Sequence, residues 1–235
     1  MSSKRRPTSK SYMNLKKALS RKQKREVTAI AKKTILAISE TKAVGKQTAG
    51  EPTVPAIALF HNKAYYQGSL LTTSQGVLDP NDYSSSAARV GDELLLKNMN
   101  VRFLLSAFRP NVTYKAVLFW YGSELSALTD AIVYFTQQNK MLDRYNNEQI
   151  SIIDQKIISP NIGALPADDA NPRRTRLFTL NGNWKAKKIT YDEGSTNPRF
   201  KNIGFAIVCY DSINTAQTEQ LAEIVFDYKM KFKDL

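Results

Sequence analysis

The apolar positions divide the chain into a short helical part and a long β-strand part. Between Asn14 and Ser39, apolar residues recur at spacings near three and four or their sums, with lysines and arginines between them. This period predicts a helix over residues 14–39. The residues that set the period are Leu15, Leu19, Val27, Ile30, Ile35 and Ile38. Because like charges along this helix repel one another, we expect it to form fully only when an anion neutralises them.

From residue 56 onward, the pattern changes to that of β-strands. Val, Ile, Phe, Tyr and Thr dominate a series of segments that are separated by turns rich in Gly, Pro, Asn and Asp. These segments are residues 56–72, 92–108, 113–121, 148–159, 175–191, 202–211 and 222–232. The last segment alternates most regularly, which predicts one buried and one exposed face. We expect Ile224, Phe226, Tyr228, Met230 and Phe232 to face the core, and Asp227, Lys229 and Lys231 to face solvent.

The connections between these segments predict the architecture. No helix falls regularly between the strands, which disfavours a parallel βαβ arrangement. Within one long connection, Leu125, Leu128, Ile132 and Phe135 are spaced helically, and this predicts a short helix with Ser123 as its N-cap. Long, irregular connections between many strands are typical of a jelly roll. The predicted fold class is therefore all-β, an antiparallel eight-stranded jelly-roll sandwich that carries a basic, partly helical N-terminal arm.

Charge is concentrated at the start of the chain and sets the predicted domain boundaries. The formal net charge is +13, and residues 1–46 contain 14 basic and two acidic residues, whereas the remainder contains 20 basic and 19 acidic residues. We place a basic arm at residues 1–46, a linker rich in Gly, Pro and small polar residues at 47–55, and the sandwich at 56–235. Residues 1–13 are polar and basic, and are expected to be disordered when alone.

The basic residues of the arm are the first candidate site. Lysines and arginines that neutralise phosphates release condensed counterions, so we expect strong, sequence-tolerant binding to nucleic acid that salt weakens steeply. A solvated helix face is the structural alternative, and the same clusters suit a nuclear import signal or a mitochondrial presequence. The predicted nucleic-acid-binding residues are Lys4, Arg5, Arg6, Lys10, Lys16, Lys17, Arg21, Lys22, Lys24, Arg25, Lys32 and Lys33.

Two smaller basic clusters in the sandwich are the second candidate site. Trp184 lies beside several lysines, so it can stack a base while they hold phosphates, although a tryptophan in a strand also serves as a core or interface residue. The predicted secondary contacts are Arg173, Arg174, Arg176, Trp184, Lys185, Lys187 and Lys188.

Catalytic and metal chemistry lacks the residues it needs. The only histidine is His61, expected at a strand surface, and the only cysteine is Cys209, expected to be buried. A catalytic triad, a clustered-histidine metal site and a structural zinc site therefore lack ligands, and no glycine-rich phosphate loop is present. Asp168 and Asp169 suit either a calcium ion at a subunit contact or a solvated loop. We expect no enzyme activity, no cofactor and no metal.

The cysteine count and the apolar runs predict a reducing compartment for synthesis and no membrane span. A single cysteine cannot form an internal disulfide, so synthesis in a reducing compartment is expected. No apolar run approaches the roughly 18 residues of a membrane span, and the start of the sequence lacks the apolar segment of a secretory signal.

Five stretches, taken in order, resemble one protein family. They are residues 89–105 (RVGDELLLKNMNVRFLL), 114–121 (YKAVLFWY), 142–159 (LDRYNNEQISIIDQKIIS), 187–211 (KKITYDEGSTNPRFKNIGFAIVCYD) and 222–234 (AEIVFDYKMKFKD). Their order and spacing are similar to those in capsid proteins of small circular Rep-encoding single-stranded DNA (CRESS-DNA) viruses. The resemblance covers roughly residues 88–235, together with the basic arm as a general feature. Plant satellite RNA virus capsids have a similar fold and a basic amphipathic arm.

The resemblance implies a single jelly roll that assembles with copies of itself into an icosahedral shell. About 60 copies form the smallest complete shell of this symmetry. The arms are expected inside, on a single-stranded DNA genome, although these residues suit RNA as well as DNA. We therefore expect a virion protein that is in the host nucleus during assembly, where the basic clusters suit recognition by host nuclear import factors. The arm departs from many relatives because it is lysine-rich and helix-patterned. Two alternatives remain: a non-capsid protein that condenses nucleic acid and carries a β-sandwich interaction domain, and a carbohydrate-binding or metal-dependent jelly-roll enzyme.

Overall fold

The structure, a computed structural model, describes residues 20–38, 41–48, 56–76, 87–109, 111–159, 174–211 and 215–234. The chain separates into two compact units, with the boundary between Glu40 and Thr41. The described part of the first unit is one helix, and the second is built almost entirely of antiparallel β-sheet. The predicted all-β, antiparallel class is confirmed for this second unit.

Helix α2 comprises Arg21–Ile38, within the range predicted from the apolar period. A reciprocal capping box explains where it begins. The backbone N–H of Gln23 donates to the Ser20 hydroxyl at 3.2 Å, and the backbone N–H of Ser20 donates to the Gln23 side-chain oxygen at 3.0 Å. Val27 and Ile30, two of the residues that set the period, are 53% and 66% exposed. Residues 14–19 lie outside the described part.

One sheet, which we call sheet A, has the strand order β1-β11-β6-β9, and β2 also pairs with β11. The strands are β1 (Lys42–Thr48), β2 (Ile57–Phe60), β6 (Glu93–Ala107), β9 (Arg174–Thr190) and β11 (Gln220–Asp234). Because β6 occupies one edge of β11, β1 and β2 share the other edge. Thr48 pairs with Phe226 and Ile57 pairs with Ile224, so the two short strands follow one another along that edge.

Strand β1 differs from the sequence-based domain boundaries. Residues 42–46 were expected in the arm and 47–55 in the linker, yet Lys42–Thr48 forms an edge strand of the sandwich. The physical reason is that an edge strand is held largely by its backbone hydrogen bonds and needs few apolar side chains. Val44, only 7% exposed, is the buried anchor of a segment that otherwise reads as polar.

The second sheet, sheet B, has the order β3-β10-β7-β8. Its strands are β3 (Tyr65–Gln67), β7 (Val112–Gly122), β8 (Ser151–Ile158) and β10 (Lys201–Asp211). A short parallel pair, β4 (Ser74–Gln75) and β5 (Ala87–Arg89), stands apart from both sheets. Each predicted strand segment overlaps one of the long strands, with bounds that differ by at most three residues, or, for residues 56–72, contains the two short strands β2 and β3.

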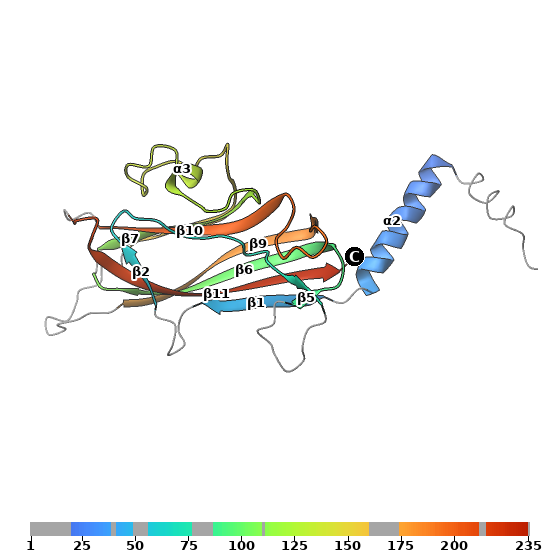
Figure 1. Cartoon of the computed structure of the whole chain (residues 1–235), viewed down its shortest axis with the longest axis horizontal. Helices are drawn as coiled ribbons and strands as arrows, with labels where there is room; N and C mark the ends of the chain where they lie inside the picture. Colours follow the sequence, from blue (N-terminus) through green and yellow to red (C-terminus); the bar gives the residue numbers. More distant parts are fainter. Residues whose placement is uncertain are drawn as a thin grey trace, which may run out of the picture. The chain divides into compact units, whose positions relative to one another are not determined.

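The main core lies between the two sheets (Figure 1). Its centre is aromatic: Phe226 lies edge-on to Phe205 with 4.8 Å between ring centroids, and Phe103 lies edge-on to the same ring at 4.9 Å. Four of the predicted core residues of β11 are at most 1% exposed, and Tyr228 packs against the core while partly exposed. The alternation in the last strand therefore predicted its buried face correctly.

The outer face of sheet B is covered by residues 123–150, which connect β7 to β8. Val117 and Phe119 of β7 form a second buried cluster with Val133, Tyr134 and Ile150 of this connection. This second layer explains why β7 is buried on both faces and reads as a nearly continuous apolar run.

The helix predicted from Ser123 to Phe135 is mostly absent in this connection. Only Asp130–Val133 forms a helix, α3, and its N-cap is Thr129, whereas Ser123 lies in a turn. The leucines and isoleucine of the helical pattern pack against sheet B from an irregular backbone, and Phe135 is 67% exposed. Packing against the sheet, not helical amphipathicity, accounts for the apolar spacing.

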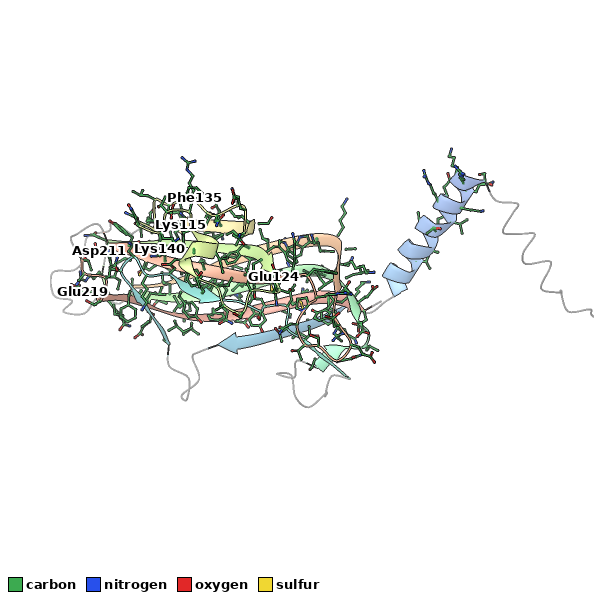
Figure 2. All side chains as sticks on the ribbon, turned by 45° about the horizontal axis from the view of Figure 1, so that its top comes forward. Lys115, Glu124, Phe135, Lys140, Asp211 and Glu219 are labelled. Carbon is green, nitrogen blue, oxygen red and sulfur yellow. The ribbon has the colours of Figure 1, made fainter. Side chains whose placement is uncertain are left out.

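A buried polar network holds this connection on the sheet. The ammonium of Lys115, on β7, donates to the carbonyl oxygens of Lys140, Met141 and Asp143 at 3.2, 3.3 and 2.7 Å. Lys140, which lies beside Lys115 in Figure 2, is in turn 3.0 Å from a carboxylate oxygen of Asp130. Burial lowers the pKa of Lys115, and the nearby Asp143 carboxylate opposes that shift. Lys115 lies 25 to 28 positions before the three residues whose carbonyl oxygens it binds, so the network ties the connection to β7 and fixes its path.

Arg89, in one of the stretches that carry the family resemblance, has a structural position. It is fully buried and donates to the carbonyl oxygens of Gly91 and Ser195, at 2.6 and 2.7 Å. Its guanidinium also lies 4.2 Å from the ring centroid of Tyr191. These contacts fasten the end of β5 to the turn before β6 and to the loop between β9 and β10.

Candidate nucleic-acid interface

Helix α2 presents exposed cations. The described side chains of α2 are all exposed, including those of Arg21, Lys22, Lys24 and Arg25. No ion pair joins any of these four residues to a carboxylate in the part of the chain that the structure describes, although Glu26 lies in the same helix. With a rise of about 1.5 Å per residue, the four charges are confined to roughly one and a half turns. This is a dense positive surface that phosphates can approach without first breaking an ion pair.

The other predicted arm residues cannot be placed. Residues up to 19 lie outside the described part of the chain, and the side chains of two further lysines in α2 do as well. These residues are Lys4, Arg5, Arg6, Lys10, Lys16, Lys17, Lys32 and Lys33.

The arginine cluster of the sandwich is only partly described. Arg173 lies outside the described residues, as does the side chain of Arg174. Arg176 donates from its guanidinium to the carbonyl oxygen of Ser159 at 2.7 Å. Arg176 thereby joins the start of β9 to the end of β8, which gives it a structural contact of its own.

Trp184 has the position of a core residue. Its ring packs edge-on against Trp120, with ring centroids 5.4 Å apart and planes at 65°. Gly182 makes room for it, because a Cβ atom there would lie 2.4 Å from the Trp184 ring. Of the two interpretations that the sequence left open for Trp184, this packing supports the core residue over the exposed base-stacking platform.

The lysines that follow Trp184 differ in their surroundings. Lys185 is exposed. The Lys187 ammonium lies 5.1 Å from the ring centroid of Trp120, a cation–π contact. Lys188 pairs with Glu93 at 2.5 Å across the sheet. Lys187 and Lys185 are therefore the members of this cluster whose charge is not offset by an ion pair with a described carboxylate.

Sequence reasoning missed three residues that lie beside these lysines. Trp120, Phe200 and Lys201 line the same cavity as Lys187 and Lys188. Phe200 is 65% exposed between two cations, Arg199 and Lys201. That basic–aromatic–basic triplet was the available signal. Its proximity to β9 could not be read from the sequence.

His61 and Cys209 are both placed in the interior. His61 was expected at a strand surface, but it is only 8% exposed. Its Nδ1 accepts the backbone N–H of Asp211 at 3.2 Å, which explains how the imidazole is accommodated. Cys209 is buried as expected, and burial raises the pKa of its thiol to about 12. A thiol with so high a pKa is protonated at neutral pH and is a poor nucleophile.

Among the residues that the structure describes, no three His, Cys, Asp or Glu side chains are grouped so that they could hold a metal ion. Asp168 and Asp169 lie outside that part of the chain. None of the described helices combines the length and the apolar character that crossing a bilayer requires.

Comparison with known proteins gives little likeness. No protein-family model matches the chain, and no curated protein matches its sequence. Among solved structures, a structure of infectious bursal disease virus, Gx strain, aligns with 7% identity and a TM-score of 0.32. The alignment covers 83% of this chain and 32% of the viral chain, so this chain spans about a third of the length of that neighbour. The functional proposal is accordingly based on the geometry of the chain and on the resemblance of its sequence stretches.

Proposed function

We propose that this chain is a structural capsid protein that assembles with copies of itself into a closed icosahedral shell and packages a small single-stranded genome through its basic arm. The observation that carries the proposal is the separation of charge between two units. An exposed cationic helix precedes an antiparallel β-sandwich whose acidic and basic residues nearly balance. A polyanion-binding arm and a neutral wall are the two parts that such a container needs.

The strand order supports a jelly roll. If β1 and β2 are counted as one strand because they share an edge of β11, the two sheets contain eight strands. Numbered along the chain, sheet A then has the order 1-8-3-6 and sheet B the order 2-7-4-5. Every connection between consecutive strands of this numbering crosses from one sheet to the other, except that from strand 4 to strand 5, as is the case when two Greek keys fold into a jelly roll.

The sandwich has features that suit a wall built from many copies. Its near-neutral charge lets copies approach without large mutual repulsion. Large apolar side chains are exposed on its surface, including Leu142 (82% exposed), Ile157 (66%) and Leu177 (62%). Buried apolar area is the main source of association free energy, so these side chains are candidates for contacts between copies. Contacts that close around symmetry axes give a shell instead of a filament.

For the cargo we propose single-stranded DNA, on the strength of the family resemblance. Phosphate contacts from α2 would serve RNA equally well, because both polymers carry one charge per nucleotide. The proposed location is the virion, with assembly in the host nucleus after import through the basic arm. We attribute no catalytic activity and no cofactor to the chain. The second candidate function is a non-capsid protein that condenses nucleic acid, because an exposed cationic helix serves that role as well.

Expression of the full chain, followed by size-exclusion chromatography and negative-stain microscopy, tests the proposal. We expect shells on the order of 20 nm across, since about 60 sandwich domains of this size must tile the surface. Nuclease-treated shells should contain protected nucleic acid, whose sugar type identifies the cargo. Deletion of residues 1–33 should remove the cargo and leave the sandwich folded. Monomers at every salt and protein concentration would refute the shell and favour the condensing protein.

A further inference from the structure

A cavity of about 170 Å³ lies between β9, β7 and the start of β10. Its apolar lining includes Trp120, Ile189 and Phe200, and its polar lining consists of Thr190 and three lysines, Lys187, Lys188 and Lys201. No acidic residue is among the residues that line it. The cavity therefore has aromatic walls and a positive rim.

Some of the cations around the cavity form no ion pair with a described carboxylate. Lys188 is paired with Glu93 at 2.5 Å, and Arg199 lies 3.5 Å from a carboxylate oxygen of Asp192. Lys187 and Lys201 form no ion pair with any carboxylate in the described ranges. Lys187 faces the Trp120 ring. Two lysine charges thus remain for an anion at the cavity.

Phe200 is the most unusual residue of the cavity. It is 65% exposed, and the Arg199 guanidinium lies 5.2 Å from its ring centroid. Exposure of a large aromatic side chain to water is unfavourable, and folding of the sandwich does not require it. An exposed aromatic ring between cations is the arrangement that single-stranded nucleic-acid sites use, because every base has a face that stacks and every nucleotide a phosphate that pairs.

The register of sheet A places the cavity at the end of the sandwich where the arm is attached. Lys42 pairs with Phe232, Phe232 with Leu96, and Leu96 with Lys187, so Lys42 and Lys187 lie in one row across the four strands. Three strand spacings, roughly 14 Å, separate them. The residues of the arm join the sandwich at Thr41, next to Lys42. Nucleic acid that is bound by the first unit is thus tethered through the chain to this end of the sandwich.

We propose that this cavity binds one nucleotide of the packaged single strand. The base stacks on Phe200 and its edge reaches toward Trp120, while Lys187 and Lys201 contact the neighbouring phosphates. The inference rests on the proposed packaging function and adds a second contact, made by the wall itself. It also commits to an unpaired strand, because a base inside a duplex is stacked on its neighbours and cannot reach a protein ring.

Binding of a fluorescein-labelled 20-mer oligothymidylate to the full chain tests the proposal. Fluorescence anisotropy is measured at low protein concentration, before assembly, for Phe200→Ala and for Phe135→Ala as the matched control. Phe135 is 67% exposed and lies in the 123–150 connection, so both variants lose a comparable exposed ring. We expect Phe200→Ala to weaken binding about fivefold or more, the lower range for loss of one stacked base, and Phe135→Ala to leave it unchanged. Both variants should melt at the wild-type temperature.

A crosslinking experiment locates the contact independently. The same oligonucleotide with 5-iodouracil in place of thymine is irradiated with the full chain, and the crosslinked peptides are identified by mass spectrometry. Crosslinks at Phe200 or Trp120 support the proposal. It is overturned if they fall elsewhere, or if Phe200→Ala binds like Phe135→Ala.

Two further measurements distinguish other outcomes. In the first, heparin competes with oligothymidylate for the protein. If heparin binds at Lys187 and Lys201 while Phe200→Ala binds oligothymidylate normally, the cavity is a site for sulfated glycans and the nucleotide proposal fails. A variant with the four described α2 cations replaced by glutamine distinguishes the two proposals. Loss of binding in that variant, with no effect of Phe200→Ala, refutes only the cavity. Unchanged binding in that variant refutes the proposed role of the arm.

Discussion

The sharpest test of the cationic helix is the salt dependence of nucleic-acid binding. We consider the variant in which Arg21, Lys22, Lys24 and Arg25 are all replaced by glutamine. Glutamine has nearly the helix propensity of lysine and arginine, and the capping box of Ser20 and Gln23 is untouched, so α2 should persist. The change therefore removes charge and little else.

The magnitude follows from the exposure of these side chains. All four are exposed and free of ion pairs with described carboxylates, so each is counted as one phosphate contact. For single strands, the slope of log K against log salt is about −0.7 per contact, so the variant should have a slope shallower by about 2.8. Between 50 and 200 mM salt, the wild-type protein should therefore lose about 50-fold more affinity than the variant does.

The assay is anisotropy titration of a short labelled oligothymidylate over that salt range. The matched control replaces four exposed cations of the sandwich, namely Lys63, Arg102, Arg144 and Lys156, by glutamine. Circular dichroism of each variant checks that the folded content is unchanged. Equal slopes for wild type and helix variant, or an equal reduction in the control, would refute the assignment of the polyanion contacts to α2.

Three predictions concern the sandwich. Phe226→Ala should destabilise it by about 3–5 kcal/mol in a denaturant titration, because it empties the centre of the aromatic core; Phe226→Asp should prevent folding, and a soluble variant with a normal melt would show that the buried face of β11 is misassigned. Lys115→Met leaves three carbonyl oxygens without their donor, so it should lower the free energy of unfolding by about 1–3 kcal/mol and expose residues 134–146 to protease. The control Lys156→Met should have neither effect. Burial raises the pKa of Asp143, but hydrogen bonds from the backbone N–H groups of Gln137 and Thr136 outweigh it and lower the pKa below its usual value. Its stabilising contribution is therefore present above about pH 4 and lost as pH falls through the lowered pKa, so Asp143→Asn should reduce stability at pH 7 and flatten the acid limb; an unchanged acid limb would contradict this.

The strands were predictable because their alternation is local. In β11, residues two positions apart share one face of the strand. The alternate residues from Ile224 to Phe232 could therefore be assigned to the core from the sequence. Strand β1 was missed because it has one buried apolar anchor, Val44, and its other interactions are made by the backbone. Backbone pairing at a sheet edge leaves little trace in the residue types.

The connection over residues 123–150 was misread for a different reason. Its apolar spacing follows the outer surface of sheet B, and its path is set by Lys115, a residue that precedes it in the chain. The cavity beside Phe200 has the same character. Its walls come from β7, β9 and β10, and only the register of the sheets brings them together.

The position of β1 has a mechanical consequence. Lys42, its first residue, is tied to Asp234 by an ion pair at 2.5 Å, and seven residues of β1 pair with β11. Tension transmitted along the axis of this strand from its first residue loads the whole ladder of hydrogen bonds in shear, so that they resist together instead of breaking one after another. In the proposed shell, a force exerted by the genome along this strand would therefore be resisted by all of these hydrogen bonds together, whereas a sideways force would separate the strand from β11 one bond at a time.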